Sequence, residues 1–408
     1  MKKYYPFVAF LVLTTTALAC TFQIGGLQPS SADQVATVVA ATVQALTPAS
    51  SSVEAPSPTS APAGLLPHDL YFTNNDAAGI VQVYRLATDG KTITQLTSEK
   101  SAVSSYDVSL TDGSIVYVAN NQILLINADG SARRMLVDGG PVDPNDQFST
   151  SVSNPVFSPN GQTIAYGYKG LNLYAVSTGV SNRVLEQKVN PDAPSLPGET
   201  YAPRKYSPDG GKLLISVIIP NSDGSSTGVY YPSGNALIQL TGDGARLCCS
   251  EQAWLSDGSG LYVASAMVGF FASGLWKLDA ATGNSTTLLP SEAGGGAYNL
   301  AAFPYLATDG NLYFFYNTAP NPNGTIDHAP LQMVRTATDG VTGRAILRAD
   351  TFTSINEALW APDASFVITA TAPIQDVYQG GIVELYYADS TKPMISLLPF
   401  GQQLKWGR

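Results

Sequence analysis

The sequence predicts an all-β domain made of seven similar four-stranded units that close into a ring. One segment recurs at intervals of roughly 50 residues, which is the period of such units. Each copy has an apolar or aromatic stretch, a turn and a run of alternating apolar residues; Gly or Asn suits the tight turn of a hairpin. The clear copies are PVFSPNGQTIAY (155–166), RKYSPDGGKLLIS (204–216), QAWLSDGSGLYVAS (252–265) and ALWAPDASFVITA (358–370).

A second series of turns lies between these copies, as in ATDGK (87–91) and NADGS (127–131), so each repeat holds four strands, A to D. Six complete repeats run from about residue 102 to residue 398. Strands B, C and D alone precede them (68–97), and a lone A strand, QQLKWGR (402–408), follows them. The two fragments complete a seventh unit and leave no free sheet edge. The prediction is a seven-bladed β-propeller closed by its terminal strands.

The repeat segments also resemble a known family. FSPNGQTIAY, YSPDGGKLLIS and WLSDGSGLYVAS are similar to the repeat of TolB-like propellers, a WD-repeat-like family, although the Gly-His and Trp-Asp pairs of true WD repeats are absent. The resemblance covers residues 68–408 and implies the propeller fold. It implies no single function, because propellers include binding proteins, scaffolds and enzymes.

The N-terminus is typical of an exported protein. Residues 1–19 have two lysines, an apolar core and small residues before Cys20, which predicts a signal peptide of the lipoprotein type. Lipid on Cys20 would anchor the chain to the membrane. Ala17-x-Ala19 also suits ordinary signal peptidase, which would leave a secreted protein. Residues 20–67 predict a tether with a short helix and a Pro/Ser-rich linker.

Composition excludes several classes of function. Charged residues make up 13% of the chain and the net charge is −10, without the cationic clusters that nucleic acid requires. His68 and His328 are the only histidines, and no phosphate-binding or dinucleotide-binding loop is present, so we predict no cofactor and no metal. The G-x-S-x-G match at Ser226 lies in a polar loop and lacks the strand–turn–helix context of a nucleophile elbow.

Strand direction assigns the connections to two faces. The A–B and C–D turns share one face, called the turn face here, and the B–C and D–A connections share the other, the loop face. The turn-face connections are short and rich in Gly, whereas those of the loop face are long and varied, as in 188–202 and 318–330. Because binding residues concentrate on variable loops of a rigid scaffold, we expect a ligand on the loop face.

One repeat position carries mostly polar residues at the start of the innermost strands. We call it the ring position and assign to it Tyr106, Asn154, Pro203, Glu251, Asn299, Glu357 and Gln403. These side chains either hydrogen-bond neighbouring blades and channel water or form a ring that binds a ligand. The two carboxylates would then suit a cation or a basic segment of a partner.

Two further features lie in loop-face connections. Cys248 and Cys249 are adjacent and form either a strained vicinal disulfide or two reduced packing residues. Phe270 and Phe271 either fold over their blade or form an exposed apolar patch that contacts a partner.

The sequence therefore predicts a membrane-anchored, extracytoplasmic, non-enzymatic propeller that binds a protein, peptide or glycan. Two alternatives remain. Glu251 and Glu357 could be the acid/base pair of a glycan hydrolase or lyase, for which carboxyl separation would be decisive. The chain could also be a structural component of the cell envelope without a specific ligand.

Overall fold

A computed structural model describes residues 64–189, 198–219, 225–245, 251–269, 272–320, 328–374 and 377–408. Residues 64–408 form one compact unit of antiparallel sheets. Blades are numbered here from the N-terminus. Blade 1 contains β1 (Leu70–Asn75), β2 (Val81–Leu86), β3 (Ile93–Gln95) and the second half of β28 (Ile395–Trp406). Blade 2 contains β4 (Ser105–Val108), β5 (Ile115–Ala119), β6 (Gln122–Ile126) and β7 (Arg134–Asp138).

The next three blades follow the same plan. Blade 3 contains β8 (Ser153–Phe157), β9 (Thr163–Gly167), β10 (Gly170–Ala175) and β11 (Val180–Glu186). Blade 4 contains β12 (Thr200–Tyr206), β13 (Leu213–Ile218), β14 (Ser226–Tyr231) and β15 (Ala236–Gln239). Blade 5 contains β16 (Glu251–Trp254), β17 (Gly260–Ser265), β18 (Gly274–Asp279) and β19 (Ser285–Leu289).

The last two blades are less regular. Blade 6 contains β21 (Ala297–Leu306), β22 (Leu312–Pro320), β23 (Gln332–Thr336) and β24 (Ala345–Ile346), with β20 (Glu292–Gly294) added beside β21. Blade 7 contains β25 (Ile355–Trp360), β26 (Phe366–Thr371), β27 (Gly381–Tyr387) and the first half of β28. Two short helical turns, α3 (Gln147–Thr150) and η1 (Asp243–Ala245), lie in connections between blades.

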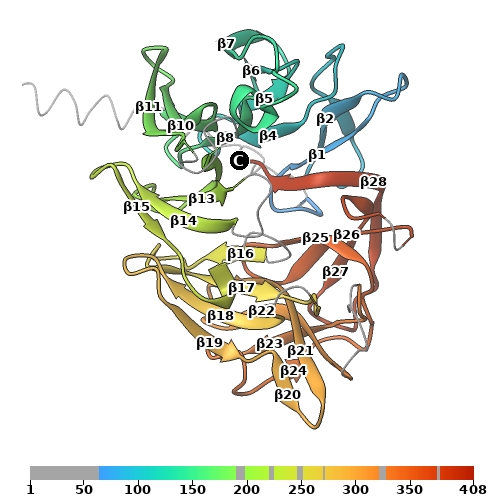
Figure 1. Cartoon of the computed structure of the whole chain (residues 1–408). Coiled ribbons are helices and arrows are strands. Elements are labelled where there is room, and N and C mark those ends of the chain that lie inside the picture. The colour runs from blue at the N-terminus through green and yellow to red at the C-terminus, as the bar shows by residue number, and fades with distance from the viewer. Residues whose placement is uncertain are drawn as a thin grey trace, which may run out of the picture. The chain divides into compact units, whose positions relative to one another are not determined.

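The two ends of this unit meet in one sheet, as Figure 1 shows where β28 runs beside β1. The first half of β28 pairs with β27, and its second half pairs with β1, with Leu70 opposite Trp406 and Tyr71 opposite Lys405. Blades 7 and 1 therefore share a strand and appear as one seven-stranded sheet. The prediction of a seven-bladed, all-β propeller closed by the C-terminal strand is confirmed.

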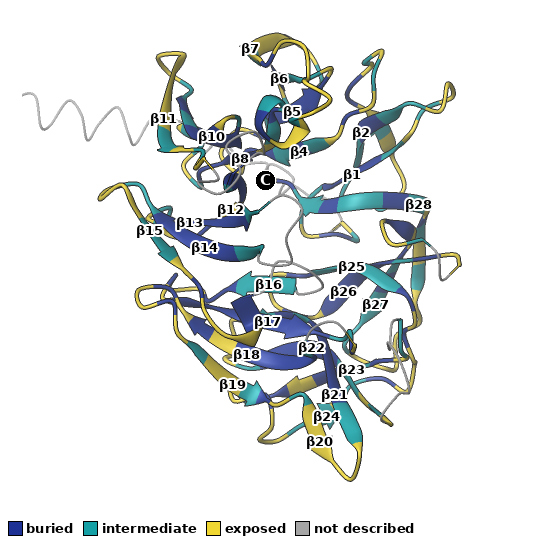
Figure 2. Ribbon diagram, in the orientation of Figure 1, coloured by how far each residue is buried: buried dark blue, intermediate teal, exposed yellow. Residues whose placement is uncertain are grey.

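The hydrophobic core is divided among the blade interfaces. Each of seven buried clusters joins two neighbouring blades, and together they pass once around the ring. At the closing interface, Leu70 and Phe72 of blade 1 pack with Ile368 and Leu385 of blade 7. Middle strands such as β5 and β17 are buried on both faces, whereas outer strands such as β7 are exposed (Figure 2). Successive side chains of a strand point to opposite faces of its sheet, so each repeat supplies apolar side chains to the interfaces with both neighbouring blades.

Indole hydrogen bonds also join neighbouring blades. The Nε1–H of Trp406 donates to the carbonyl of Trp360 at 2.8 Å, and that of Trp360 donates to the carbonyl of Phe303 at 2.9 Å. Trp254 donates to the carbonyl of Lys205 at 3.2 Å. The recurring aromatic residue of the sequence repeat therefore both fills an interface and satisfies a backbone acceptor of the preceding blade.

Candidate functional site

The loop face contains three pockets among the described residues. Each is lined by B–C or D–A connections and by the strand ends that adjoin them. Two B–C connections are tight turns, at Asn120–Asn121 and Tyr168–Lys169, and the longer connections stand beside them. The pockets therefore lie where short connections stand beside longer ones.

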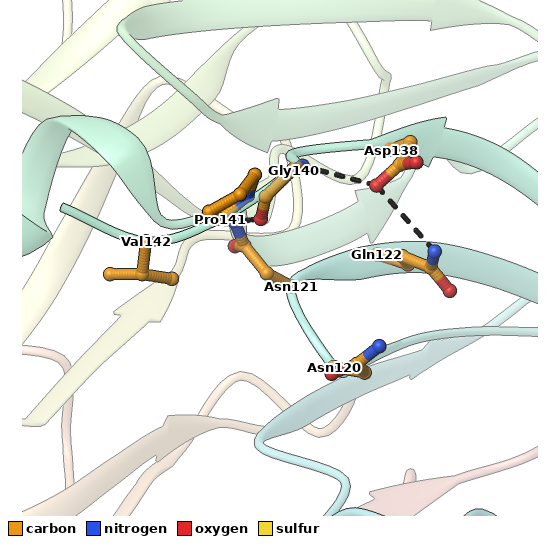
Figure 3. Close-up of a pocket in the computed structure, with 7 residues that line it drawn as sticks. All are labelled: Asn120, Asn121, Gln122, Asp138, Gly140, Pro141 and Val142. Atoms are coloured by element: carbon orange, nitrogen blue, oxygen red, sulfur yellow. Dashed lines mark hydrogen bonds between the residues drawn. The ribbon is translucent and has the colours of Figure 1, made fainter.

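The first pocket has a volume of about 500 Å³ and lies beside the turn between β5 and β6 (Figure 3). Its amides serve the fold: Asn121 Nδ2 donates to the carbonyls of Gly140 and Thr150 at 2.9 and 3.0 Å, and its Oδ1 accepts from the Val152 N–H. Gln122 contacts Asp138 at 3.5 Å. Asn121 therefore holds the connection from blade 2 to blade 3, and its side chain is already used.

The second pocket, of about 340 Å³, lies between blades 3 and 4 and includes the predicted ring residue Asn154. Asn154 is exposed, and its φ is +47°. Phe148 is exposed beside it, and Lys169 Nζ lies 5.2 Å from the centre of the Tyr168 ring. This pocket presents an apolar and aromatic surface with one cation.

The third pocket, of about 310 Å³, gathers residues from blades 5, 6 and 7 and is called the Glu251 pocket here. Its walls are largely apolar, and its polar groups include Glu251, His328, Asn356 and Tyr378. The rings of His328 and Tyr378 lie 5.0 Å apart. Asn356 Nδ2 donates to the carbonyls of Val377 and Gly380, at 2.9 and 2.7 Å, and so fixes one wall. The apolar lining consists of Ala266, Met267, Ala302, Phe303, Ala329 and Ile355.

Glu251 has an unusual electrostatic environment. Burial raises the pKa of its carboxyl group to about 8, and the Phe303 N–H, its own N–H and the Arg204 charge only partly oppose this. The group is therefore mainly protonated at neutral pH. Its Oε2 is buried and has no hydrogen-bond partner among the described residues. A neutral carboxyl group of this kind both donates and accepts a hydrogen bond.

Glu357 has the same repeat position in blade 7 but a different role. Its Oε1 accepts from the Gln403 N–H and its Oε2 from the Leu404 N–H, both at 2.7 Å. Burial raises the pKa of Glu357, while these N–H groups and Lys405 lower it. The carboxylate thus holds the strand that closes the ring, and both of its oxygen atoms are occupied.

Backbone geometry explains other members of the ring position. Asn154, Phe303 and Gln403 each have a positive φ, of 47°, 52° and 56°, at a bulge in the innermost strand. Asn favours this left-handed conformation, which is uncommon for bulky residues. Asn154 and Phe303 each lie seven residues before the glycine of the following A–B turn. Gln403 has the equivalent position in β28, which no such turn follows.

The structure corrects one member of this set. Phe303, seven residues before Gly310, occupies the ring position in blade 6, whereas the sequence analysis assigned Asn299 to it. Both residues lie on β21, which is longer than the innermost strands of blades 2 to 5. Asn299 lies opposite Thr318, is buried and is fully engaged: its Nδ2 donates to the Pro290 carbonyl, and its Oδ1 accepts from Tyr316, both at 2.8 Å.

Several predictions fall outside the described residues. These are the signal peptide, Cys20, the tether up to residue 63, Cys248, Cys249, Phe270 and Phe271. The last tether residues, 64–67, belong to the propeller unit, in which Leu66 is buried. Within the described ranges, no helix has the length and apolar character needed to span a bilayer, and no group of three potential metal ligands occurs. Ser226 begins strand β14 and is not followed by a helix.

Some residues of interest were not singled out from the sequence. The His328–Tyr378 pair brings together loops of blades 6 and 7, and such a pairing between distant loops leaves no local signal. Arg204 and Lys205 follow Pro203 of the ring position and are both exposed. Their adjacency in an innermost strand was a signal, since the other copies have uncharged residues at one or both of these positions.

Comparison with known proteins finds similar folds among solved structures. No protein-family model matches the sequence, and no curated protein matches it. Prolyl oligopeptidase B from Galerina marginata is similar with a TM-score of 0.51 and 12% identity, over 82% of this chain and 49% of that chain. TolB from Acinetobacter baumannii is similar with a TM-score of 0.41 and 16% identity, over 82% of this chain and 79% of that chain.

A third structure, a protein from Lactobacillus plantarum, has a TM-score of 0.49 and 16% identity, and the match covers 84% of this chain and 99% of that chain. This chain spans about half the length of the prolyl oligopeptidase, and identities this low carry no information on activity. The chain is structurally similar to TolB-like β-propellers and to other propeller proteins, and this similarity concerns the fold.

Proposed function

We propose that this protein is a membrane-anchored, extracytoplasmic β-propeller that binds a peptide segment of another protein on its loop face, without catalysing a reaction. The observation that carries the proposal is the Glu251 pocket, in which apolar walls surround one buried carboxyl oxygen that has no partner among the described residues. An apolar pocket with a few convergent polar groups is the usual form of a binding site.

The chemistry of this pocket favours a peptide. Its volume of about 310 Å³ suits an apolar side chain, and Met267 and Phe303 offer adaptable and aromatic contacts. A protonated Glu251 donates to a backbone carbonyl and accepts from a backbone N–H of the ligand. The ligand would thus satisfy an oxygen that the described fold leaves unpaired.

The contacts of Glu357 support a binding role over a catalytic one. A glycan hydrolase needs two carboxyl groups that both reach the substrate. The two oxygen atoms of Glu357 each accept a backbone N–H at 2.7 Å, so this residue is engaged in ring closure. Glu251 would therefore lack the partner that the enzymatic alternative assigned to it.

The N-terminal residues support the proposed location. A signal peptide over residues 1–19, with lipid on Cys20 and a tether after it, would hold the propeller outside the cytoplasm. Metabolic labelling with an alkyne fatty acid tests the anchor. We expect lipid on the wild-type protein and none on the Cys20→Ser variant, whereas an unlabelled wild-type protein would favour the secreted alternative.

A matched pair of tryptophan variants tests the binding site. Peptides selected from a random display library on the purified protein are titrated against wild type, Ala329→Trp and Val341→Trp. Ala329 lines the Glu251 pocket, and Val341 lies exposed in the turn-face connection between β23 and β24. We expect Ala329→Trp to weaken binding at least tenfold and Val341→Trp to leave it unchanged.

Two outcomes would contradict the proposal. Equal binding by wild type and Ala329→Trp would move the site elsewhere on the propeller. Specific binding on a glycan array, together with no selected peptide, would replace the peptide with a glycan. Thermal unfolding of all three proteins shows that each variant is folded.

A further inference from the structure

Two adjacent cationic side chains on an innermost strand have no hydrogen-bond or ion-pair partner among the described residues. Arg204 and Lys205 lie on β12, the innermost strand of blade 4, at a bulge that follows Pro203. Both are exposed by surface area, and neither side chain has a hydrogen bond or an ion pair among the described residues. Burial nevertheless lowers the pKa of both groups. Exposure together with many surrounding protein atoms is expected of side chains on an innermost strand, which faces the axis of the ring.

Charged groups of two other blades act on the pKa of Lys205. Lys405 on β28 in blade 1 lowers this pKa, and Asp107 on β4 in blade 2 raises it. After burial, the repulsion from Lys405 is the larger effect. Arg204 is influenced by the carboxyl group of Glu251 in blade 5. Groups from four blades therefore converge on one part of the channel.

The acidic groups nearby are already engaged. Asp107 Oδ1 pairs with Lys405 at 2.7 Å, and its Oδ2 accepts from the Phe157 N–H at 2.8 Å. Both oxygen atoms of Glu357 accept backbone N–H groups. Glu251 is mainly protonated at neutral pH, with its pKa at about 8. The charges of Arg204 and Lys205 are thus left uncompensated.

We propose that Arg204 and Lys205 form an oxyanion-binding site in the central channel, for a carboxylate or phosphate group. The planar guanidinium of Arg204 matches two oxygen atoms of such a group, and the ammonium of Lys205 adds a point charge from the adjacent position. Gln252, which follows Glu251 in the innermost strand of blade 5, has both side-chain polar atoms buried and unpaired among the described residues. In a chain with a net charge of −10, this is a local concentration of positive charge.

This site is separate from the peptide-binding function proposed above and does not depend on it. The Glu251 pocket offers a neutral carboxyl group and apolar walls, whereas the channel site offers two cations. A ligand that binds the Glu251 pocket need not bind Arg204 and Lys205, so either proposal can be contradicted while the other holds.

Titration with inorganic phosphate and with citrate, each at constant ionic strength, tests the site. Calorimetry is performed on the wild-type protein, on Arg204→Gln/Lys205→Gln and on the control Lys91→Gln, which removes an exposed turn-face lysine. We expect saturable binding of at least one anion by wild type and by Lys91→Gln, weakened at least tenfold in the double variant. The tighter of the two anions distinguishes a phosphate ligand from a carboxylate ligand.

Thermal unfolding at low salt provides a second readout. Because Lys205 is desolvated and repelled by Lys405, we expect Lys205→Gln to unfold at a higher temperature than wild type, and added anion to reduce that difference. Equal anion binding by wild type and the double variant would overturn the proposal, as would no saturable binding of either anion. A lower unfolding temperature for Lys205→Gln at low salt would also count against it.

Discussion

The starts of β16 and β25 carry the same residue type at the same repeat position and use it differently. At β25, Glu357 accepts two backbone N–H groups of the closing strand at 2.7 Å. At β16, Glu251 faces the N–H of Phe303 in the next blade, but its buried Oε2 is left without a partner among the described residues. Burial raises the pKa of both carboxyl groups.

The difference lies in what the next blade presents. At Gln403 and Leu404, a bulge turns two successive N–H groups toward the carboxylate, and these N–H groups oppose the rise in its pKa that burial causes. Beside Glu251, the bulge at Phe303 is followed by Pro304, which has no N–H to donate. One strand start is therefore a structural clamp, whereas the other leaves a buried oxygen atom without a partner among the described residues.

The largest expected effect comes from removing the clamp together with its strand. Deleting residues 402–408 removes the pairing of β28 with β1 and exposes the closing cluster around Leu70 and Phe72. We expect loss of cooperative unfolding, measured by circular dichroism in urea. A truncated protein with the same midpoint as the full-length protein would contradict ring closure.

Trp406→Ala tests the same interface with one side chain. The indole is half-buried, contacts Phe366 with ring centroids 6.2 Å apart, and donates to the Trp360 carbonyl at 2.8 Å. We expect the free energy of unfolding to fall by about 3 kcal/mol, near the lower end for such truncations. Trp406→Phe, which loses mainly the hydrogen bond, should cost about 1 kcal/mol. Equal losses in the two variants would show that the ring contact contributes little.

Glu357→Gln breaks the clamp without changing its size. The amide retains one acceptor but places an NH₂ group against the second backbone N–H, so a buried donor loses its partner. We expect a loss of about 2 kcal/mol at pH 7, measured by urea unfolding. Glu292→Gln, at an exposed position, serves as the control. A variant as stable as the control would mean that the clamp does not hold the closing strand.

Ionisation of the turn-face aspartates should stabilise the fold, whereas ionisation of Glu251 should destabilise it. Hydrogen bonds from Thr92 lower the pKa of Asp89 to about 2, and similar bonds lower those of Asp257 and Asp339. A lowered pKa in the folded state adds stability above the unfolded pKa, and this is lost as the pH falls below about 4. These groups are exposed, so we expect Asp339→Asn to change the unfolding midpoint less than the variants of the closing strand and of Glu357.

The repeat, the count of seven and the closing strand were predictable because they rest on local patterns. Turn residues, alternation and an aromatic anchor recur within each copy, and closure follows from the incomplete repeats at the two ends. The roles at the ring position were not predictable in the same way. They depend on the bulges of the neighbouring blade, and in blade 6 the sequence assignment was four residues away, at Asn299 instead of Phe303.

The site was predicted in part. The loop face was the expected location, and three pockets among the described residues open on it. Glu251 was among the candidates, but so was Glu357, and no sequence feature separated the two. Their difference arises from backbone N–H groups some 50 residues away along the chain, at Phe303 and Gln403.

The most direct test of the contrast is the free energy of unfolding of Glu251→Gln relative to wild type, at pH 6 and pH 9. Because burial raises the folded pKa of Glu251 from 4.5 to about 8, wild type should lose stability relative to the variant as the pH rises from 4.5 to about 8. The advantage of the variant over wild type should therefore grow by roughly 1 to 3 kcal/mol between pH 6 and pH 9. If the stability of the variant relative to wild type is the same at both pH values, or if the variant is less stable than wild type at pH 9, Glu251 is another clamp and not an open site.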